Sequence, residues 1–494
     1  MKAQNSNTII NTGIVRLLLF LGLLAITIAI SKQQLMIALA IATIPMIIAI
    51  GLYSLSRPYV VYLIYALYAC TFTTIMRYSR IDGLSVVLDV LLVFALISLL
   101  CSSYIRRNIQ WKKAVNILTL SYIPWVFFIL FEFINPFTQS DSVITGLRAW
   151  IGENLILYII VTILSDRWKV LKIGMMTISI YIFVCFIKLL WQKYMGFDSA
   201  EQYFLYEQGA ESTHLLHSGT RYFSFLSDAA TFGTLMSTAA FVFGVAAIKT
   251  NSRRTTIWYV FIAICSIFGQ FLSGTRGSLV IPAVGMILYT LLCKNIKMSF
   301  TMAFIGILIY SFFTFTEIGN DNQFIRRART AFHPSKDASM NVRLINRVKI
   351  AEYLKRNPLG AGIKHMVPTL RMNDEGLLVD DIIPADSFYV SVWSQTGYFG
   401  LFLLLCIHGI VIIVCSYIVM MKIKDPELRQ ILIAFTCAVL GIYVSGYTSY
   451  SPDQPPINFL IPAMIAFVIN GPYIDTEIRE LKKQSNTLTT SSHV

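Results

Sequence analysis

The apolar run 387-SFYVSVWSQTGYFGLFLLLCIHGIVIIVCSYIVMM-421 contains no aspartate, glutamate, lysine or arginine. An α-helix needs about 20 predominantly apolar residues to cross the hydrocarbon core of a bilayer, and this run is longer. Its first part, where polar residues precede Gly397, has the pattern of a re-entrant segment. The run therefore predicts a membrane-spanning helix, and the chain contains many similar runs separated by charged or Pro/Gly-containing segments.

The composition of the whole chain agrees with this prediction. Of its 494 residues, 56% are hydrophobic and 13% are charged, and the mean hydropathy is +0.66, whereas soluble domains carry about 25% charged residues. These values exclude a soluble enzyme and a disordered protein. We expect an all-α polytopic membrane protein with about 12–14 transmembrane helices and a large extracytoplasmic helical loop between late helices. The predicted spans lie near 13–31, 34–53, 58–76, 84–102, 115–135, 145–165, 170–191, 224–248, 256–272, 277–293, 298–316, 387–421, 429–448 and 456–472.

The cysteines indicate neither disulfides nor a metal site. All eight lie inside apolar runs or at their ends, and the sequence contains no Cys-x-x-Cys and no His/Cys cluster with ligand spacing. We therefore expect small apolar core residues at these positions and no bound metal. No small-residue cleavage site follows the N-terminal apolar run, so we expect a retained first span rather than a signal peptide.

Basic residues in the short connections indicate the orientation in the membrane. Connections rich in lysine and arginine alternate with connections that contain fewer of them, and basic connections stay on the cytoplasmic side. The basic set comprises Arg106, Arg107, Lys112, Lys113, Arg167, Lys169, Lys172, Lys249, Arg253, Arg254, Lys294, Lys297, Lys422, Lys424 and Arg429. We therefore expect both termini in the cytoplasm.

This orientation divides the chain into four parts. We expect transmembrane helices over 1–316, with an external loop near 192–221, and an extracytoplasmic helical loop over 317–385. Residues 386–472 are predicted to form the C-terminal transmembrane helices, and 473–494 a polar, disordered cytoplasmic tail. No inverted repeat of the kind found in transporters is visible in the sequence.

Ionisable residues inside the predicted spans gather at one depth. Each could extend its charge to the membrane surface or pair with a neighbour, as Asp89 could with Arg77 or Arg80. Together, however, they indicate a polar cavity that opens to the outside, whereas a transporter would also place polar groups at the membrane midplane. The residues in the outer part of their spans are Asp89, Glu132, Arg148, Glu153, Lys188, Asp228, Arg276 and Asp386.

The long external loop has a basic part and an acidic part. From Asp321 to Arg371 there are eleven lysines and arginines against three acids, while Met372 to Asp386 holds five acids and no Lys or Arg. The basic part contains an amphipathic stretch, 342-VRLINRVKIAEYLKR-356, which places Leu344, Val348 and Ala351 on one face and which 357-NPLGAG-362 ends. This pattern suits a phosphorylated ligand beside a neutral polyhydroxyl one. Attraction of the basic helix to anionic lipid headgroups is the alternative.

Three local motifs add a family resemblance. They are 221-RYFSFLSDAATFG-233, then 273-SGTRGSLV-280, then 343-RLINRVKIAEYLKRNPLGAGIKH-365 followed by 386-DSFYVSVWSQTGYFGLFLL-404. In this order and spacing they resemble the O-antigen polymerase/ligase family of membrane glycosyltransferases, over roughly 220–405. That family combines an arginine before a span, a Ser-x-Ser-Arg-Gly turn, an arginine-initiated helix ending in Pro-x-x-Gly-x-Gly, and a His-Asn or Asp-Ser/Asn pair before Gly-x-x-Gly.

The resemblance implies glycosyl transfer from an undecaprenyl-diphosphate-linked glycan at the outer face of the bacterial inner membrane, without a metal, a nucleotide or another cofactor. By position, Arg221 and Arg276 match the family's membrane-embedded arginines, and Arg343 matches the arginine that opens the loop helix. With Arg347, these residues are expected to bind substrate diphosphates, and Arg276 and Arg343 to act in catalysis, because a fixed guanidinium stabilises the charge of a leaving diphosphate. Capping of helix C-termini or binding of lipid phosphate is the alternative for each arginine.

At one position the sequence departs from the ligase pattern, since Asp386-Ser387 stands where the ligases have a histidine before asparagine. Asp386 can accept a proton from an acceptor hydroxyl, so we assign it a catalytic role. The missing histidine favours a polymerase. As second-tier residues, Asp228 could hold an arginine in place, and His333 and His365 could substitute for the histidine, although both could equally be solvated or packed.

We therefore predict a multi-pass polymerase that joins lipid-linked oligosaccharide repeat units into a surface polysaccharide of the O-antigen or capsule type, with its active site facing the periplasm. Its expected partners are undecaprenyl-diphosphate-linked oligosaccharide, membrane lipid and a chain-length regulator, but not nucleic acid. Two alternatives stay open: a ligase of the same family that transfers glycan to a lipid or protein acceptor, and a polysaccharide flippase or transporter without catalysis.

Overall fold

The computed structural model describes residues 50–55, 57–81, 83–106, 109–135, 145–216, 219–329, 338–372 and 378–491. Within these residues, nine helices are long and apolar enough to cross a membrane, or ten if a bent pair near the C-terminus counts as one span. The prediction of an all-α polytopic membrane protein is therefore confirmed. The predicted span at 13–31 and most of the one at 34–53 lie outside the described residues.

The elements are as follows. The helices are α3 (Pro58–Ser79), α4 (Val86–Arg106), the 3-10 helix η1 (Trp111–Ala114), α5 (Ile117–Glu132), the π-helix η2 (Arg148–Ile156), α7 (Leu157–Leu164), α8 (Trp168–Tyr194), α9 (Ser199–Gln202), the π-helix η3 (Tyr203–Glu207), α10 (Glu211–His214), α11 (Ala229–Ala247), α12 (Arg253–Ser273), the 3-10 helix η4 (Gly277–Leu279), α13 (Val280–Leu292), α14 (Ile296–Phe315), α15 (Gln323–Arg329), α16 (Ala338–Arg356), α17 (Phe388–Met421), α18 (Pro426–Ser445), the 3-10 helix η7 (Ser451–Asp453), α19 (Ile457–Ile469) and α20 (Gly471–Ser491). The strands are β1 (Leu215–Leu216), β2 (Gly219–Thr220), β3 (Val367–Met372) and β4 (Leu378–Ile383).

Each of the other twelve predicted spans contains a helix. Apart from the bent pair that begins with α19, two of these helices are too short to count among the candidate spans. The helix α5 has 16 residues, or about 24 Å of length, which is less than the roughly 30 Å of a bilayer core. The second short apolar helix is Gly277–Leu292. Both lie beside longer helices, because α5 packs against α17 and α13 packs against α18.

The chain divides into two compact units, Met1–Leu63 with Phe94–Ile109, and Ile64–Val93 with Gln110–Val494. In the first, the hydroxyl of Ser98 donates a hydrogen bond to the backbone oxygen of Ser54, at 2.6 Å. The second contains every residue of the candidate site.

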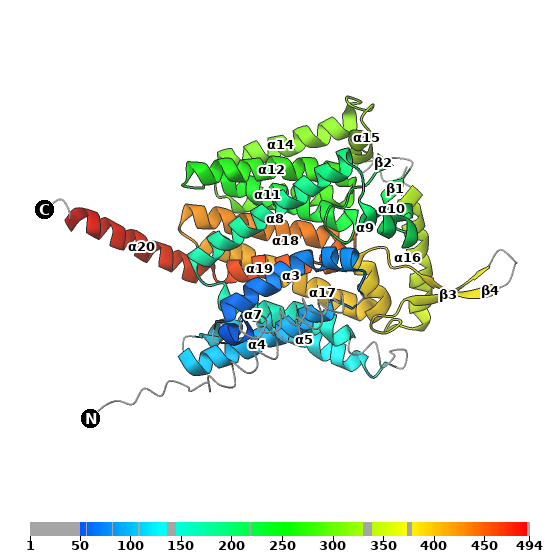
Figure 1. Cartoon of the computed structure of the whole chain (residues 1–494), viewed down its shortest axis with the longest axis horizontal. Helices are drawn as coiled ribbons and strands as arrows, with labels where there is room; N and C mark the ends of the chain where they lie inside the picture. The colour runs from blue at the N-terminus through cyan, green and yellow to red at the C-terminus, as the bar shows by residue number, and fades with distance from the viewer. Residues whose placement is uncertain are drawn as a thin grey trace, which may run out of the picture. The chain divides into compact units, whose positions relative to one another are not determined.

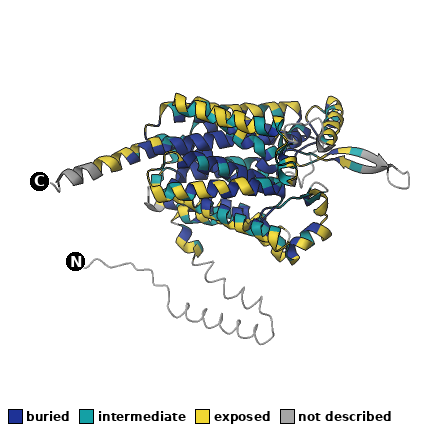
Figure 2. Ribbon diagram, turned by 90° about the horizontal axis from the view of Figure 1, so that it is seen from above, coloured by how far each residue is buried: buried dark blue, intermediate teal, exposed yellow. Residues whose placement is uncertain are grey.

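The core of the second unit is formed by α11 and α18, which pack against each other. In each of these helices 83% of the residues of the apolar window are buried, against 6% in α14. Figure 2 shows the same contrast between buried central helices and exposed outer ones. An apolar surface as extensive as that of α14 fits contact with lipid rather than with water.

The short elements α9, α10, α15 and β1 to β4 lie, with α16, at one end of the long helices of the second unit, while α20 leaves from the opposite end (Figure 1). The segment near 192–221 contains α9, η3, α10 and the β1–β2 pair. The segment 317–385 contains α15, α16 and an antiparallel hairpin, β3–β4, in which Val367 pairs with Ile383 and Met372 with Leu378. The expected loop helix is present, but the hairpin was not predicted.

The helix α16 buries a different face from the one that the sequence indicated. Leu344 and Val348 are 47% and 59% exposed, whereas Ile350 and Leu354 are buried. These two pack into a cluster with residues of the hairpin and of α17. The sequence periodicity correctly identified apolar residues that share one face of α16. The hairpin, however, packs on the opposite face, which carries Ile350 and Leu354.

A break in α17 corresponds to the re-entrant pattern at the start of the run. Gly397 has φ 66° and ψ −165° inside the helix, a conformation that is essentially restricted to glycine. A Cβ there would overlap the carbonyl oxygen of Pro358 and lie 2.9 Å from its carbonyl carbon. The turn 357–362 therefore packs directly against the break, where the N–H of Ala361 donates to the carbonyl of Ser394, at 2.8 Å.

The expectation of a disordered tail over 473–494 is wrong for 473–491, which belong to the helix α20. Ile474 and Ile478 are buried on one side of this helix. Between them, the Asp475 carboxylate accepts the backbone N–H groups of Lys424 and Asp425, at 3.1 and 2.7 Å. A single buried stripe and one carboxylate therefore order the start of a segment whose composition is otherwise polar.

Candidate active site

The motif 273-SGTRGSLV-280 forms a tight reversal between α12 and α13. Gly274 ends α12 in the left-handed region, with φ 59°, which glycine adopts without strain. The hydroxyl of Thr275 donates to the carbonyl of Ala229 at 2.7 Å and accepts a hydrogen bond from the guanidinium of Arg221 at 3.1 Å. The reversal, called the arginine turn (274–276) below, therefore joins Arg276 to the segment that carries Arg221.

Arg221 lies in a strongly positive, partly buried environment. Burial lowers the pKa of Arg221; the charge of Asp228 opposes this shift, and the charges of Arg276 and Arg343 add to it. One guanidinium nitrogen donates to the carbonyl of Thr213, at 3.0 Å. The Nε of Arg221 is buried and has no acceptor within the described residues. The structure thus brings the three predicted arginines together, in a setting that an anion would neutralise.

Asp228 serves mainly as the N-cap of α11. Its Oδ1 accepts the backbone N–H groups of Ala230 and Thr231, at 2.6 and 2.9 Å, and its Oδ2 accepts the hydroxyls of Ser227 and Thr231. Such a cap satisfies the free N–H groups of the first helical turn. Among the described residues, Asp228 forms no ion pair with an arginine, so it acts on Arg221 through its charge alone.

Three polar side chains project from one face of α16, at positions 343, 346 and 347, as the helical spacing requires. Arg343 donates to the carbonyl of Thr448 at 2.9 Å, and Arg347 donates to the carbonyl of Tyr447 at 3.0 Å. The Arg347 guanidinium also lies 4.2 Å from the centre of the Tyr447 ring, a cation–π distance. These contacts dock α16 on the segment that follows α18.

The same segment touches the arginine turn. A Cβ on Gly277 would overlap the hydroxyl of Thr448 and lie 3.3 Å from its Cβ, so only a residue without a side chain permits this approach. Arg343 contacts Thr448, and Thr448 lies against Gly277, the residue after Arg276. The two arginines therefore lie against neighbouring parts of one surface.

Asp386 lies at the start of α17 and is half-buried. Its Oδ2 accepts a hydrogen bond from the side-chain amide of Asn346, at 3.0 Å. The following residue, Ser387, has a buried hydroxyl with no partner in the described part of the chain, and the N–H of Phe388 donates to the carbonyl of Ser449, at 3.1 Å. Asp386 is therefore linked through Asn346 to the helix that carries Arg343 and Arg347. The sequence reasoning passed over Asn346, although its spacing from those arginines marks it.

Of the two second-tier histidines, the structure describes only His365. His333 lies outside the described residues. The N–H of His365 donates to the carbonyl of Gly362, at 3.2 Å, which puts this residue just after the turn that packs against the break in α17. Among the described residues, no group of three histidine, cysteine or acidic side chains could hold a metal ion.

Other charges at this depth form structural pairs. Asp89 pairs with Arg148 at 2.9 Å, rather than with Arg77 or Arg80 as the sequence suggested. Glu132 accepts a hydrogen bond from the side chain of Asn135, at 3.0 Å. For these residues the pairing alternative describes the structure.

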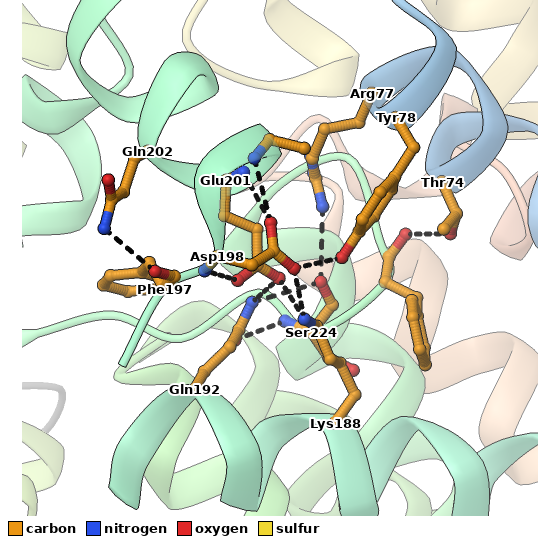
Figure 3. Close-up of polar contacts among 12 residues, drawn as sticks. Thr74, Arg77, Tyr78, Lys188, Gln192, Phe197, Asp198, Glu201, Gln202 and Ser224 are labelled. Atoms are coloured by element: carbon orange, nitrogen blue, oxygen red, sulfur yellow. Dashed lines mark hydrogen bonds and ion pairs between the residues drawn. The ribbon is translucent and has the colours of Figure 1, made fainter. Parts of the chain in front are cut away.

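A buried polar network, which the sequence did not reveal, supports the segment that carries Arg221 (Figure 3). Lys188 pairs with Asp198 at 2.8 Å and with Glu201 at 2.9 Å. Gln192 accepts the N–H of Ser224 at 2.9 Å and donates to Glu201 at 2.8 Å. Ser224 has a positive φ of 52°, so this network holds a strained turn just before α11.

Arg77, at the end of α3, completes the network. Its guanidinium donates to the backbone carbonyls of Ser224, Leu226 and Ser227 and lies 4.6 Å from the centres of the Phe204 and Phe223 rings. It therefore fixes the backbone between Arg221 and the cap of α11.

One segment of the sequence contains the arginine turn, α16 and the break in α17. This segment matches a known protein family. Residues 261–405 match the O-antigen ligase family model. This confirms the resemblance to the O-antigen polymerase/ligase family over that segment. No curated protein shows significant sequence similarity to the chain.

The O-antigen ligase segment contains Arg276, Arg343, Arg347 and Asp386, whereas Arg221 and Asp228 precede it. The match supports a function of the O-antigen polymerase/ligase type, carried out by enzymes that act on glycans. With the apolar helices, it describes a multi-pass membrane protein in which one segment matches the O-antigen ligase family model.

Proposed function

We propose that the protein is a metal-independent glycosyltransferase that polymerises lipid-diphosphate-linked oligosaccharide repeat units into a surface polysaccharide. The observation that carries this proposal is the group of positive charges at Arg221, Arg276 and Arg343, to which Asp386 is linked through Asn346 of the helix that carries Arg343. Guanidinium groups bind phosphate oxygens with forked, charge-assisted hydrogen bonds. A diphosphate on a polyprenyl carrier would bring negative charge to this group of cations.

In the reaction, the oxygen of an acceptor hydroxyl forms a bond to the anomeric carbon of the donor glycan. The bond from that carbon to the diphosphate oxygen breaks, and its electron pair stays on the diphosphate. Because negative charge grows there as the bond breaks, arginines held in place stabilise the transition state more than the ground state. Arg276 and Arg343 are assigned this role, with Arg221 and Arg347 binding the diphosphates.

Asp386 receives the proton of the acceptor hydroxyl. Its Oδ2 already accepts the amide of Asn346, which leaves Oδ1 for the hydroxyl and fixes the direction of the carboxylate. A general base must reach the proton that it removes at hydrogen-bond distance, so orientation by Asn346 matters as much as the charge.

A cavity next to Asp386 suits the acceptor glycan. Its lining includes Phe388 and Ser391, which closely follow Asp386 in the sequence, and Trp150, Tyr450 and Asp453. The indole N–H of Trp150 is buried and has no acceptor within the described residues. Aromatic faces beside a few polar groups are the usual lining of small-molecule sites, and they match the apolar face and polar rim of a sugar ring.

The proposed location is the bacterial inner membrane, with the site facing the periplasm. The basic residues Arg167, Lys169 and Lys172 lie at the start of α8, and the network around Lys188 lies at its end. The basic connection and the site are therefore at opposite ends of one spanning helix, which supports a periplasmic site under the positive-inside rule. A chain-length regulator would then meet the protein at the periplasmic end.

The second candidate is a ligase that transfers finished glycan to a lipid or protein acceptor, and the O-antigen ligase match at 261–405 favours it. Single replacements Arg276→Gln, Arg343→Gln and Asp386→Asn, followed by gel analysis of the surface glycan, test the proposal. A single-repeat-unit product is expected from a polymerase defect, and lipid-linked long chains that never reach their acceptor are expected from a ligase defect. Normal long chains in all three variants would refute a catalytic role for this site.

A further inference from the structure

The helix α15 carries three arginines, and two of them have clear structural tasks. Arg329 donates to the carbonyls of Phe313 and Ile318, both at 3.2 Å, and to the side chain of Asn320. It therefore ties α15 to the end of α14. Arg326 is exposed and donates to the carbonyl of Asn320, at 3.4 Å. Neither contact directs these two side chains to the candidate site.

Arg327 instead packs on the arginine turn. A Cβ on Gly274 would lie 3.3 Å from the Cδ and the Nε of Arg327 and 3.4 Å from the Cγ of Arg221. Two arginine side chains therefore approach the same glycine. The half-buried Arg327 comes from an element that is 53 positions away from Gly274 along the sequence.

A small cavity lies where α15 meets the arginine turn. Its volume is about 10 Å³, and it is lined by Gly274, Thr275 and Arg276 on one side and by Phe324 and Ala328 on the other. Arg327 precedes Ala328 on α15 but does not itself line this cavity. A cavity of this size holds about one water molecule, so it has room for a single phosphate oxygen beside Arg276.

We propose that Arg327 is a further phosphate-binding residue, which forms an anion subsite with Arg221 and Arg276 at the arginine turn. This inference rests on the proposed function and names one more group that would hold the substrate diphosphate. A diphosphate carries at least two negative charges, so it can offset the mutual repulsion of neighbouring guanidinium groups. The buried Nε of Arg221, which lacks an acceptor within the described residues, gains one when a phosphate oxygen binds.

The chain offers a matched control, because Arg326 precedes Arg327 on the same short helix and is exposed. The test uses the purified full-length protein and measures the binding of inorganic diphosphate to the wild type and to the Arg327→Gln, Arg326→Gln and Arg276→Gln variants. We expect Arg327→Gln to weaken diphosphate binding about tenfold, the loss expected for one charge-assisted hydrogen bond. Arg326→Gln should leave the affinity within about twofold of the wild type.

The variants separate this inference from the proposed function. If Arg276→Gln loses affinity but Arg327→Gln binds as the wild type does, the subsite is refuted and the proposed function stands. If the wild type does not bind diphosphate at all, both are refuted. Should Arg327→Gln fail to fold, Arg327→Lys replaces it, and unchanged affinity in that variant would exclude recognition by the guanidinium fork.

A lipid phosphate is the other source of the same chemistry. Vesicles that contain phosphatidylglycerol, offered in place of diphosphate, distinguish the two sources. Loss of vesicle binding in Arg327→Gln with unchanged diphosphate binding would overturn the assignment in favour of a headgroup site.

Discussion

Replacement of Gly397 by alanine tests whether the break in α17 holds the segment 317–385 in place. The backbone at Gly397, with φ 66° and ψ −165°, costs a residue with a side chain about 1–3 kcal/mol. The new Cβ would also overlap backbone atoms of Pro358, and forcing atoms into a packed region adds typically about 1–3 kcal/mol. We therefore expect Gly397→Ala to destabilise the protein by about 2–6 kcal/mol.

The assay compares this variant with Gly409→Ala in the same helix. Among the described residues, and apart from the adjacent backbone of the helix itself, no atom lies within 4 Å of the position that the new methyl group would take at Gly409. Alanine is also the better helix former by about 0.5–1 kcal/mol. Thermal unfolding of the purified protein in detergent should therefore show a lower midpoint for Gly397→Ala and an unchanged or higher one for Gly409→Ala. Equal midpoints for Gly397→Ala and the wild type would refute the reasoning.

Three further predictions follow from contacts around the site. Replacing Arg77 with glutamine removes its hydrogen bonds to three backbone carbonyls, which fix the segment that follows Arg221. The surface glycan should therefore lose its long chains, and diphosphate binding should weaken. Unchanged diphosphate binding would contradict a positioning role for Arg77. Asn346→Leu should lower the polymer yield about as much as loss of the Asp386 base, with normal protein levels in the membrane, and an unaltered glycan ladder would exclude orientation by this amide. Burial lowers the pKa of His214 below its usual 6.5, with the positive charges of Arg221 and Arg77 adding to the shift and Asp228 and a backbone hydrogen bond opposing it. Its neutral ring therefore stabilises the fold above pH 6.5, and this contribution is lost as the pH falls. The midpoint temperature of thermal unfolding should be lower at pH 5 than at pH 7, and His214→Gln should reduce this difference.

The sequence predicted the spanning helices because a single physical requirement, an apolar length, marks each of them. Twelve predicted spans contain helices in the structure, and the arginines selected from motif order lie together. The resemblance to the O-antigen polymerase/ligase family followed from the same ordered motifs. These features depend on local composition and on residues that lie at the ends of apolar runs.

Features that depend on contacts between distant segments were missed. The β3–β4 hairpin is rich in acidic residues, which strands disfavour, so nothing in its composition marked it. The stripe of Ile350 and Leu354 became buried only because this hairpin covers it. Arg327 lies among other arginines, and its contact with Gly274 depends on how α15 packs against the arginine turn.

The turn 357–362 and the break in α17 meet through main-chain atoms. The N–H of Ala361 donates to the carbonyl of Ser394, and a Cβ added at Gly360 would lie only 2.8 Å from the backbone N of Thr396. A joint of this kind does not depend on the identity of the surrounding side chains. The exposed residues of the loop can therefore diverge with the sugars of each polysaccharide while the spacing between Arg343 and Asp386 is preserved. Substrate range and catalytic geometry can then evolve separately in one protein.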